Sequence, residues 1–143
     1  MMVSQTAEYA LRAVVVLGKN PDNLMGTKQI SIESKVPAGY LSKVLQTLAR
    51  ANLVTSTPGR SGGFQLSHAP EEISVFDVIQ AIEPLQRIHS CPLSLPGHGT
   101  NLCPLHRRLD DAMAQTEAAF RNSTVAEIMA ERTDSPPLCE MPS

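Results

Sequence analysis

The chain has 143 residues, enough for one domain or for one domain with an accessory element. Hydrophobic residues make up 42% and charged residues 18%, an ordinary globular composition that excludes extensive disorder. Aromatic residues make up only 3% and Trp is absent, so the core must consist of aliphatic side chains and Met, which suits helices packed on helices.

The hydropathy and cysteine content predict a cytoplasmic protein that does not contact a membrane. The longest purely apolar run, residues 13–17, is far shorter than the roughly 20 residues needed to span a bilayer. Glu8 and Arg12 interrupt the N-terminal stretch that a signal peptide would need. Three cysteines, an odd number, argue against a disulfide framework and favour a reducing compartment.

The net charge of −2 conceals an uneven distribution. Residues 1–68 carry seven Lys or Arg and three Asp or Glu, whereas residues 69–143 carry five and eleven. A basic first half suggests a polyanionic partner, such as nucleic acid, for that half alone. Chance also produces such an imbalance, so it supports DNA binding only together with other features.

The first third of the chain predicts a helix-turn-helix. A stripe of apolar residues at helical spacing predicts a helix from about Ser4 or Thr6 to Leu17, with Gly18 as its stop signal. Thr27 is a candidate N-cap for a short helix that ends near Ser34, before Pro37. A third, longer helix is predicted over about 38–51. Its buried face would comprise Leu41, Val44, Leu45 and Leu48.

A β-hairpin follows this motif and completes a winged helix. Residues 53–57 and 64–67 are strand-like, and the turn between them is rich in Pro and Gly. Arg60 lies among the glycines of that turn, where its guanidinium can reach phosphate or the minor groove.

The polar face of the third helix is the predicted DNA-reading surface. Residues near the start of a recognition helix usually meet base edges, which favours Tyr40, Ser42 and Lys43 for base readout. Lys35 flanks the motif and suits a phosphate. The candidate DNA-binding residues are Lys28, Tyr40, Ser42, Lys43, Gln46, Thr47 and Arg60. A merely solvated polar face is the alternative interpretation.

The second half predicts helices separated by a long loop. Ser74–Asp77 forms a capping box that opens a helix to about Glu83. Residues 84–104 lack periodicity, and a loop of this length is usually functional or disordered. A helix from Leu105 to about Arg121 follows, and its apolar face has no obvious partner within so short a chain, which predicts a homodimer. Asp110 and Asp111 are interpreted as ordinary helix surface.

A second capping box at Thr124–Glu127 opens a short helix to about Arg132. The predicted organisation is therefore a winged helix-turn-helix DNA-binding domain over 1–83 and a cysteine-containing sensor loop over 84–104. A dimerisation helix with a short terminal helix follows over 105–132, and a disordered tail with Cys139 over 133–143.

The loop contains candidate metal ligands: Cys91, Cys103 and His106, with His98 between the cysteines. Thiolate and imidazole are natural ligands for zinc or iron. Spacing alone leaves open a reactive thiol or cysteines without a role. The sequence has no Gly-rich phosphate loop, nucleophile elbow or His-Glu-x-x-His motif, so nothing in it supports catalysis. We therefore expect that the protein is not an enzyme.

Three segments resemble the bacterial IscR/NsrR-type family of regulators: residues 4–13, 36–41 and 62–64. The cysteine loop before a long helix adds to the resemblance, which extends to about residue 132. It implies a mainly α fold, a winged helix-turn-helix with a small two-stranded β wing and a long C-terminal dimerisation helix. It also implies a dimeric repressor that responds to iron–sulfur status, nitric oxide, iron or redox state.

Cluster-binding members of that family carry three loop cysteines, sometimes with a histidine three residues after the last. Cys91 and Cys103 match the outer cysteines and His106 matches that histidine, but Gly97 stands about where the middle cysteine belongs. Glu8 is similar to an acidic ligand that some members supply from the other subunit. The resemblance thus implies an iron–sulfur cluster, and the missing thiolate favours [2Fe–2S]. The implied ligands are Cys91, Cys103, His106, His98 and Glu8.

The predicted partners are double-stranded DNA with a palindromic operator and a second copy of the chain. The alternatives are a zinc- or thiol-based regulator without a cluster, and a winged-helix module that binds another protein. The operator, the signal, the cluster type and the form that binds DNA are not determined by the sequence.

Overall fold

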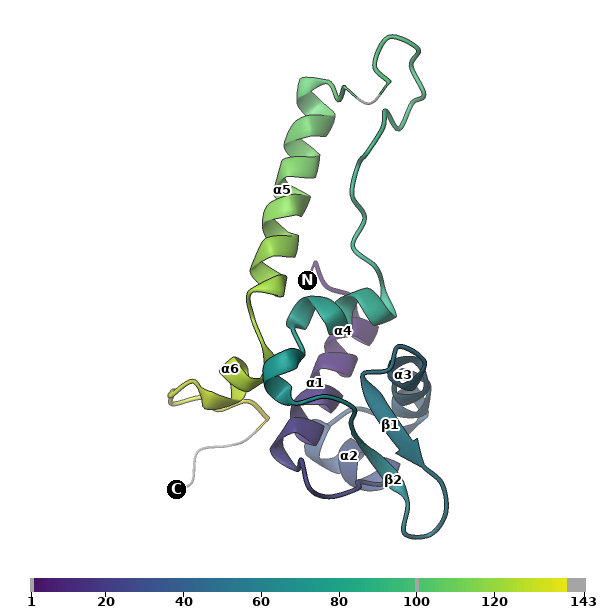
Figure 1. The fold of residues 1–143 in the computed structure, drawn as a ribbon, viewed down its shortest axis with the longest axis vertical. Coiled ribbons are helices and arrows are strands. Elements are labelled where there is room, and N and C mark those ends of the chain that lie inside the picture. The colour runs from purple at the N-terminus through teal and green to yellow at the C-terminus, as the bar shows by residue number, and fades with distance from the viewer. Residues whose placement is uncertain (1, 100, 139–143) are drawn as a thin grey trace.

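The computed structural model describes residues 2–99 and 101–138 and is mainly helical, as predicted. In chain order the elements are α1 (Gln5–Lys19), α2 (Thr27–Ser34), α3 (Ala38–Arg50), β1 (Val54–Thr57), β2 (Gly63–Leu66), the 3-10 helix η1 (Pro70–Glu72), α4 (Val75–Ile82), α5 (Pro104–Arg121) and α6 (Val125–Ala130). The helices α1–α4 and the hairpin form a compact body, from which α5 and the segment before it project (Figure 1).

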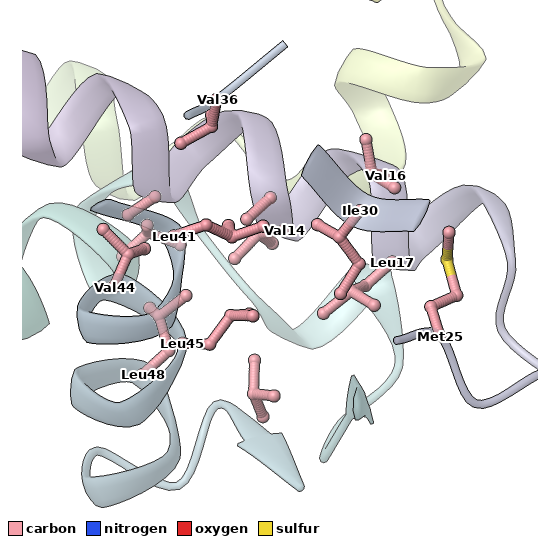
Figure 2. Close-up of a cluster of buried hydrophobic side chains, with 14 of the residues drawn as sticks. Val14, Val16, Leu17, Met25, Ile30, Val36, Leu41, Val44, Leu45 and Leu48 are labelled. Atoms are coloured by element: carbon pink, nitrogen blue, oxygen red, sulfur yellow. The ribbon is translucent and has the colours of Figure 1, made fainter. Parts of the chain in front are cut away.

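The core lies around α1, which packs against α2, α3, α4 and α6. Figure 2 shows hydrophobic side chains of α1, α2 and α3 meeting in one cluster, to which Val78 of α4 and Val125 of α6 also belong. The predicted inner face of α3 is confirmed, because all four of its aliphatic side chains are at most 2% exposed. These four are Leu41, Val44, Leu45 and Leu48.

The prediction that Gly18 ends the first helix is wrong. Helix α1 continues to Lys19, and Asn20 caps it by donating from its side chain to the Val16 carbonyl at 2.9 Å. Gly18 is buried against α6, where a Cβ atom would stand 2.9 Å from the sulfur of Met129. The glycine therefore marks a close contact between two helices rather than a helix end.

The turn between α2 and α3 is closed by a buried serine. The Ser34 hydroxyl donates to the Ile30 carbonyl at 2.6 Å and accepts from the Val36 N–H at 3.3 Å. Lys35 then takes the left-handed conformation, with φ at 58°, and reverses the chain. At the other end of α2, Gly26 is the N-cap and Thr27 is the first helical residue, so the predicted Thr27 cap is wrong.

The hairpin pairs β1 with β2 in antiparallel register, with Val54 opposite Leu66 and Thr57 opposite Gly63. Met25, from the loop before α2, joins it by exchanging backbone hydrogen bonds with Phe64 at 2.8 and 3.0 Å. A Cβ on Gly63 would stand 2.7 Å from the Met25 carbonyl oxygen, so only glycine allows this approach. The wing is thus attached directly to the helix-turn-helix.

Two capped helix starts lie side by side and bring α6 back to the body. The predicted capping box of α4 is confirmed, because Ser74 Oγ accepts from the Asp77 N–H and Asp77 accepts from the Ser74 N–H, both at 3.0 Å. Thr124 caps α6, and a β-bridge joins it to Ser74. Beyond α6, Leu138 packs against the core; residues 139–143, including Cys139, lie outside the described residues.

Candidate DNA interface and sensor loop

The candidate DNA-binding residues lie on α2, α3 and the hairpin, away from the far end of α5 (Figure 1). On α3, Tyr40 is 60% exposed, and Ser42, Lys43 and Gln46 are also exposed. The Thr47 hydroxyl donates to the Lys43 carbonyl at 2.9 Å, so part of its bonding capacity is used within α3. Lys28 on α2 and Arg60 in the hairpin turn are exposed as well.

A chain of contacts on α1 connects Glu8 with the turn of the helix-turn-helix. Arg12 Nε lies 2.8 Å from Glu8 Oε2, and its Nη1 donates to the carbonyls of Ser34 and Lys35 at 3.4 Å each. The role of Arg12 was not predicted, because its partners Ser34 and Lys35 lie more than twenty positions away.

Aromatic contacts extend this chain to the start of α3. The Arg12 guanidinium lies over the Tyr9 ring, 5.3 Å from its centroid. The Tyr9 and Tyr40 ring centroids are 6.0 Å apart in a tilted arrangement. Glu8 and the candidate base-reading Tyr40 therefore belong to one set of contacting side chains.

The predicted sensor loop brings one cysteine and one histidine together. Cys103 is the N-cap of α5, and its Sγ lies 3.3 Å from Nδ1 of His106 in the first turn of that helix. Cys91 is buried, with 6% of its surface exposed, and its N–H donates to the Gly99 carbonyl at 3.3 Å.

The other predicted ligands are placed differently. His98 lies in the loop, and its Nδ1 is buried without a hydrogen-bond partner in the part of the chain that the structure describes. Glu8 lies on α1 and is paired with Arg12. Among the described residues, no three or more His, Cys, Asp or Glu side chains gather into a group that could hold a metal ion. One chain alone therefore does not assemble the full predicted ligand set.

An ion pair fastens the base of the loop to α5. Arg87 donates to both carboxylate oxygens of Asp110, at 2.8 and 2.9 Å, and the Ile88 N–H donates to the same carboxylate at 2.8 Å. The hydrogen bond from Arg87, and next that from Ile88, lower the pKa of Asp110 to about 2. The pKa of Arg87 is raised, chiefly by its hydrogen bond to Asp110. The interpretation of Asp110 as ordinary helix surface is wrong.

Helix α5 leaves an apolar face uncovered. None of its residues is buried, and Leu105 and Leu109 are 61% and 46% exposed. A groove along this face is lined by Met2, Leu85, Gln86, Leu109, Ala112, Met113 and Thr116. Across residues 2–99 and 101–138, the helices are too short or too polar to cross a membrane.

Comparisons with known proteins identify relatives over nearly the whole chain. Residues 3–131 match the Rrf2 family model, described as iron-dependent transcriptional regulator. An HTH-type transcriptional regulator of Aquifex aeolicus is 28% identical over 132 residues, which cover 90% of this chain and 92% of that protein.

Solved structures give the same result. The crystal structure of Staphylococcus aureus CymR superposes with a TM-score of 0.69 at 28% identity, covering 92% of this chain and 100% of that one. CymR of B. subtilis, described as the global cysteine regulator, has a TM-score of 0.72 at 20% identity, with 88% and 94% covered. T. potens IscR has a TM-score of 0.72 at 21% identity, with 88% and 84% covered. The last two likenesses concern the fold.

Proposed function

Because the chain belongs to the Rrf2 family of iron-dependent transcriptional regulators, we propose that it is a homodimeric, DNA-binding repressor that senses redox state, iron or nitric oxide through its Cys91–His106 loop. Its membership confirms the resemblance to IscR-type regulators, and the family consists of transcriptional regulators rather than enzymes. The observation that carries the sensing proposal is the 3.3 Å contact between Cys103 Sγ and His106 Nδ1, at the end of the loop that contains Cys91.

The ligand chemistry of the loop fits an iron–sulfur cluster, for which [2Fe–2S] is our proposal. Cys91 and Cys103 would supply the thiolates and His106 an imidazole. The buried Nδ1 of His98 supports a fourth donor in the loop, because a buried nitrogen without a hydrogen bond is costly unless something else binds it. A bound cluster would supply a centre that gains or loses an electron and reacts with nitric oxide or oxygen.

A regulator without a cluster is the second candidate. The same contact pairs the Cys103 thiol with the His106 imidazole. An imidazole beside a thiol can accept its proton, and the resulting thiolate is the reactive form of cysteine. The similar CymR of B. subtilis is described as a cysteine regulator, and the oxidised form of S. aureus CymR is among the similar structures. Zinc on the same ligands is a further possibility of this kind.

We assign DNA binding to the exposed face of α3, supported by α2 and the wing. Tyr40, Ser42 and Lys43 lie in the first half of α3, where recognition helices usually meet base edges. Lys28 and Arg60 would contact phosphates on either side. The Arg12 guanidinium contacts both Glu8 and the carbonyls of the turn before α3. A change in what Glu8 binds would therefore change the hydrogen bonds that hold this turn and position the recognition helix.

The dimer proposal rests on the uncovered apolar face of α5. Helix α5 has 18 residues, is about 27 Å long and buries none of its residues within this chain, so its contacts with α4 and the loop leave its apolar face to be covered by something else. Leu109 and Met113, which line the groove, would pack against the same face of a second copy in a two-fold arrangement. Such a dimer would present two recognition helices to a palindromic operator, whose half-sites lie about one helical turn apart.

The test is anaerobic purification followed by iron and sulfide analysis, a visible spectrum, and binding to the promoter DNA of the protein's own gene. Equal amounts of iron and sulfide with visible absorption support the cluster. Colourless protein with stoichiometric zinc, or with no metal, supports the second candidate instead. Salt-sensitive binding supports the DNA-binding assignment, whereas unchanged migration of the promoter fragment at low salt supports the protein-interaction module.

A further inference from the structure

The loop between α4 and α5 is attached to α5 near its base, a few residues after α4 ends. No helix or strand forms between Ile82 and Pro104 among the described residues, and a loop without such elements is normally attached to the rest of the protein only at its ends. Instead, residues 87 and 88 lie against α5. Arg87 makes two parallel bonds to Asp110, and Ile88 adds a backbone bond to the same carboxylate.

The contact of Arg87 and Ile88 with Asp110, which we call the clamp, has a more specific geometry than an ordinary surface ion pair. Two parallel guanidinium–carboxylate bonds fix both distance and orientation, which a lysine could not do. The two side chains are 29% and 15% exposed, so solvent screens them less than a fully exposed pair. Arg87 also donates to Glu117 at 3.0 Å, and Glu117 lies two turns further along α5.

The base of the clamp is itself connected to the body of the protein. Glu117 accepts a second bond, from Arg121 at 3.4 Å. The Arg121 guanidinium lies 3.8 Å above the ring of Phe76 in α4. The loop base, α5 and α4 are thus joined by one series of charged and aromatic contacts.

We propose that Arg87 and Asp110 are positioning residues that hold Cys91 near Cys103 and His106; this rests on the proposed function, in which these three residues form the sensing centre. Ile88 is fixed to α5 and lies three positions before Cys91, whereas Glu83, the C-cap of α4, lies eight positions before it. The other cysteine is fixed as the N-cap of α5, about 10 Å along the helix from Asp110.

The clamp should raise the local concentration of one thiol near the other. Cys91 and Cys103 are always joined by the loop between them, which is twelve positions long. The clamp adds a second path, three positions from Cys91 to Ile88, which is fixed to α5, so it narrows the space that Cys91 samples and raises its effective concentration near the start of α5. The turns within the loop, including the bond from the Cys91 N–H to the Gly99 carbonyl, would move with the clamped base as one unit.

The test uses full-length metal-free protein in a Cys139→Ser background, so that Cys91 and Cys103 are the only thiols. Diamide oxidises the two thiols to a disulfide and is itself reduced, and mass spectrometry follows the rate. We expect R87Q and D110N to form the disulfide a few-fold more slowly than the parent. D111N, which removes the neighbouring exposed carboxylate, and R108Q, which removes an exposed arginine of α5, are the matched controls and should match the parent.

A double-variant cycle and a conservative variant complete the test. R87Q/D110N should be no slower than either single variant, because both remove the same contact. R87K keeps the charge but not the paired bonds, so we expect it to form the disulfide at an intermediate rate. R87K also provides a test of the contact if D110N does not fold. Rates equal to the parent in folded R87Q, D110N and R87K would overturn the clamp. If wild-type protein binds no metal while these rates differ, the metal centre fails and the clamp stands.

Discussion

Gly18 and Met129 form a close contact that leaves little room for a larger side chain: a Cβ at Gly18 would lie 2.9 Å from the Met129 sulfur and 3.3 Å from Cγ1 of Val125. The contact joins α1 to α6 and so attaches the end of the described chain to the winged helix. Since glycine is otherwise unfavourable inside a helix, its presence in α1 indicates that this packing outweighs the loss of helix propensity.

Substitution of Gly18 should therefore destabilise the fold in proportion to side-chain size. G18V should lower the free energy of unfolding by about 1–3 kcal/mol, since a branched side chain forces α6 outward. G18A should be close to neutral, because the flexible end of Met129 can move. G39A, at a glycine with open space around it, is the control and should be unchanged or more stable by up to about 1 kcal/mol. Urea unfolding measures each value, and an equally stable G18V would contradict the contact.

Lys43 and Arg60 should contribute to DNA binding through phosphate contacts. Replacing both by Ala should weaken binding to the promoter of the protein's own gene and flatten its salt dependence by about one to two units, since each phosphate contact contributes about 0.9. R108A, on α5, is the control and should keep the wild-type slope. Fluorescence anisotropy at several salt concentrations measures this. A correctly folded double variant with an unchanged slope would refute the assignment of α3 and the wing.

The apolar face of α5 should form the dimer interface. M113E or L109E should produce monomer or aggregate, because a charge would be buried between two copies of the helix. Q115E adds the same carboxylate at an exposed position on another side of α5 and should remain dimeric. Analytical ultracentrifugation at micromolar concentration distinguishes these states, and wild-type protein that sediments as a monomer would show that the interface is absent.

Cys91 and Cys103 should be essential to any metal centre, because thiolates are its strongest available ligands. C91S or C103S should abolish the cluster absorption and leave iron below stoichiometric amounts. C139S should have no effect and is the control. Anaerobic absorption spectra with iron and sulfide analysis measure the outcome.

The remaining candidate ligands should tune the centre rather than hold it. H106A, H98A and E8A should each shift its spectrum or shorten its lifetime in air, with H106A having the largest effect because His106 already contacts Cys103. The same spectra, followed over time in air, measure these changes. Loss of the cluster in C139S together with its retention in H106A would favour a three-cysteine site that uses the tail.

The pairing of Asp110 should make part of the stability depend on pH in the acid range. Its pKa falls from 3.8 to about 2 on folding, so the folded protein favours the charged form. The pair therefore stabilises the fold fully above about pH 4, and this contribution is lost as the pH falls toward 2. The stability difference between wild type and D110N should shrink over that range, as measured by urea unfolding at pH 5, 4 and 3. D111N, which leaves the pair intact, should show the same pH dependence as wild type; a constant difference for D110N would contradict the pairing.

The amino-acid sequence determined the elements whose signals are local. The buried face of α3 follows from apolar residues at helical spacing, and α4 begins where Ser74 and Asp77 cap each other within four residues. The hairpin follows from β-branched segments around a glycine-rich turn. The two cysteines and His106 were found as candidate ligands because they stand together in a segment without periodicity.

Contacts between distant segments were decided by the folded chain. Gly18 was interpreted as a helix end because its neighbours in α6 are more than one hundred positions away, and glycine has the same local signature in both cases. Met25 joins the wing, Arg12 reaches the turn before α3, and Arg87 reaches Asp110, each through packing that brings remote groups within bonding distance. Hydrophobic periodicity and capping residues indicate which face of its own helix or strand a residue occupies. Which remote residue it contacts is determined only when those faces pack together in the folded chain.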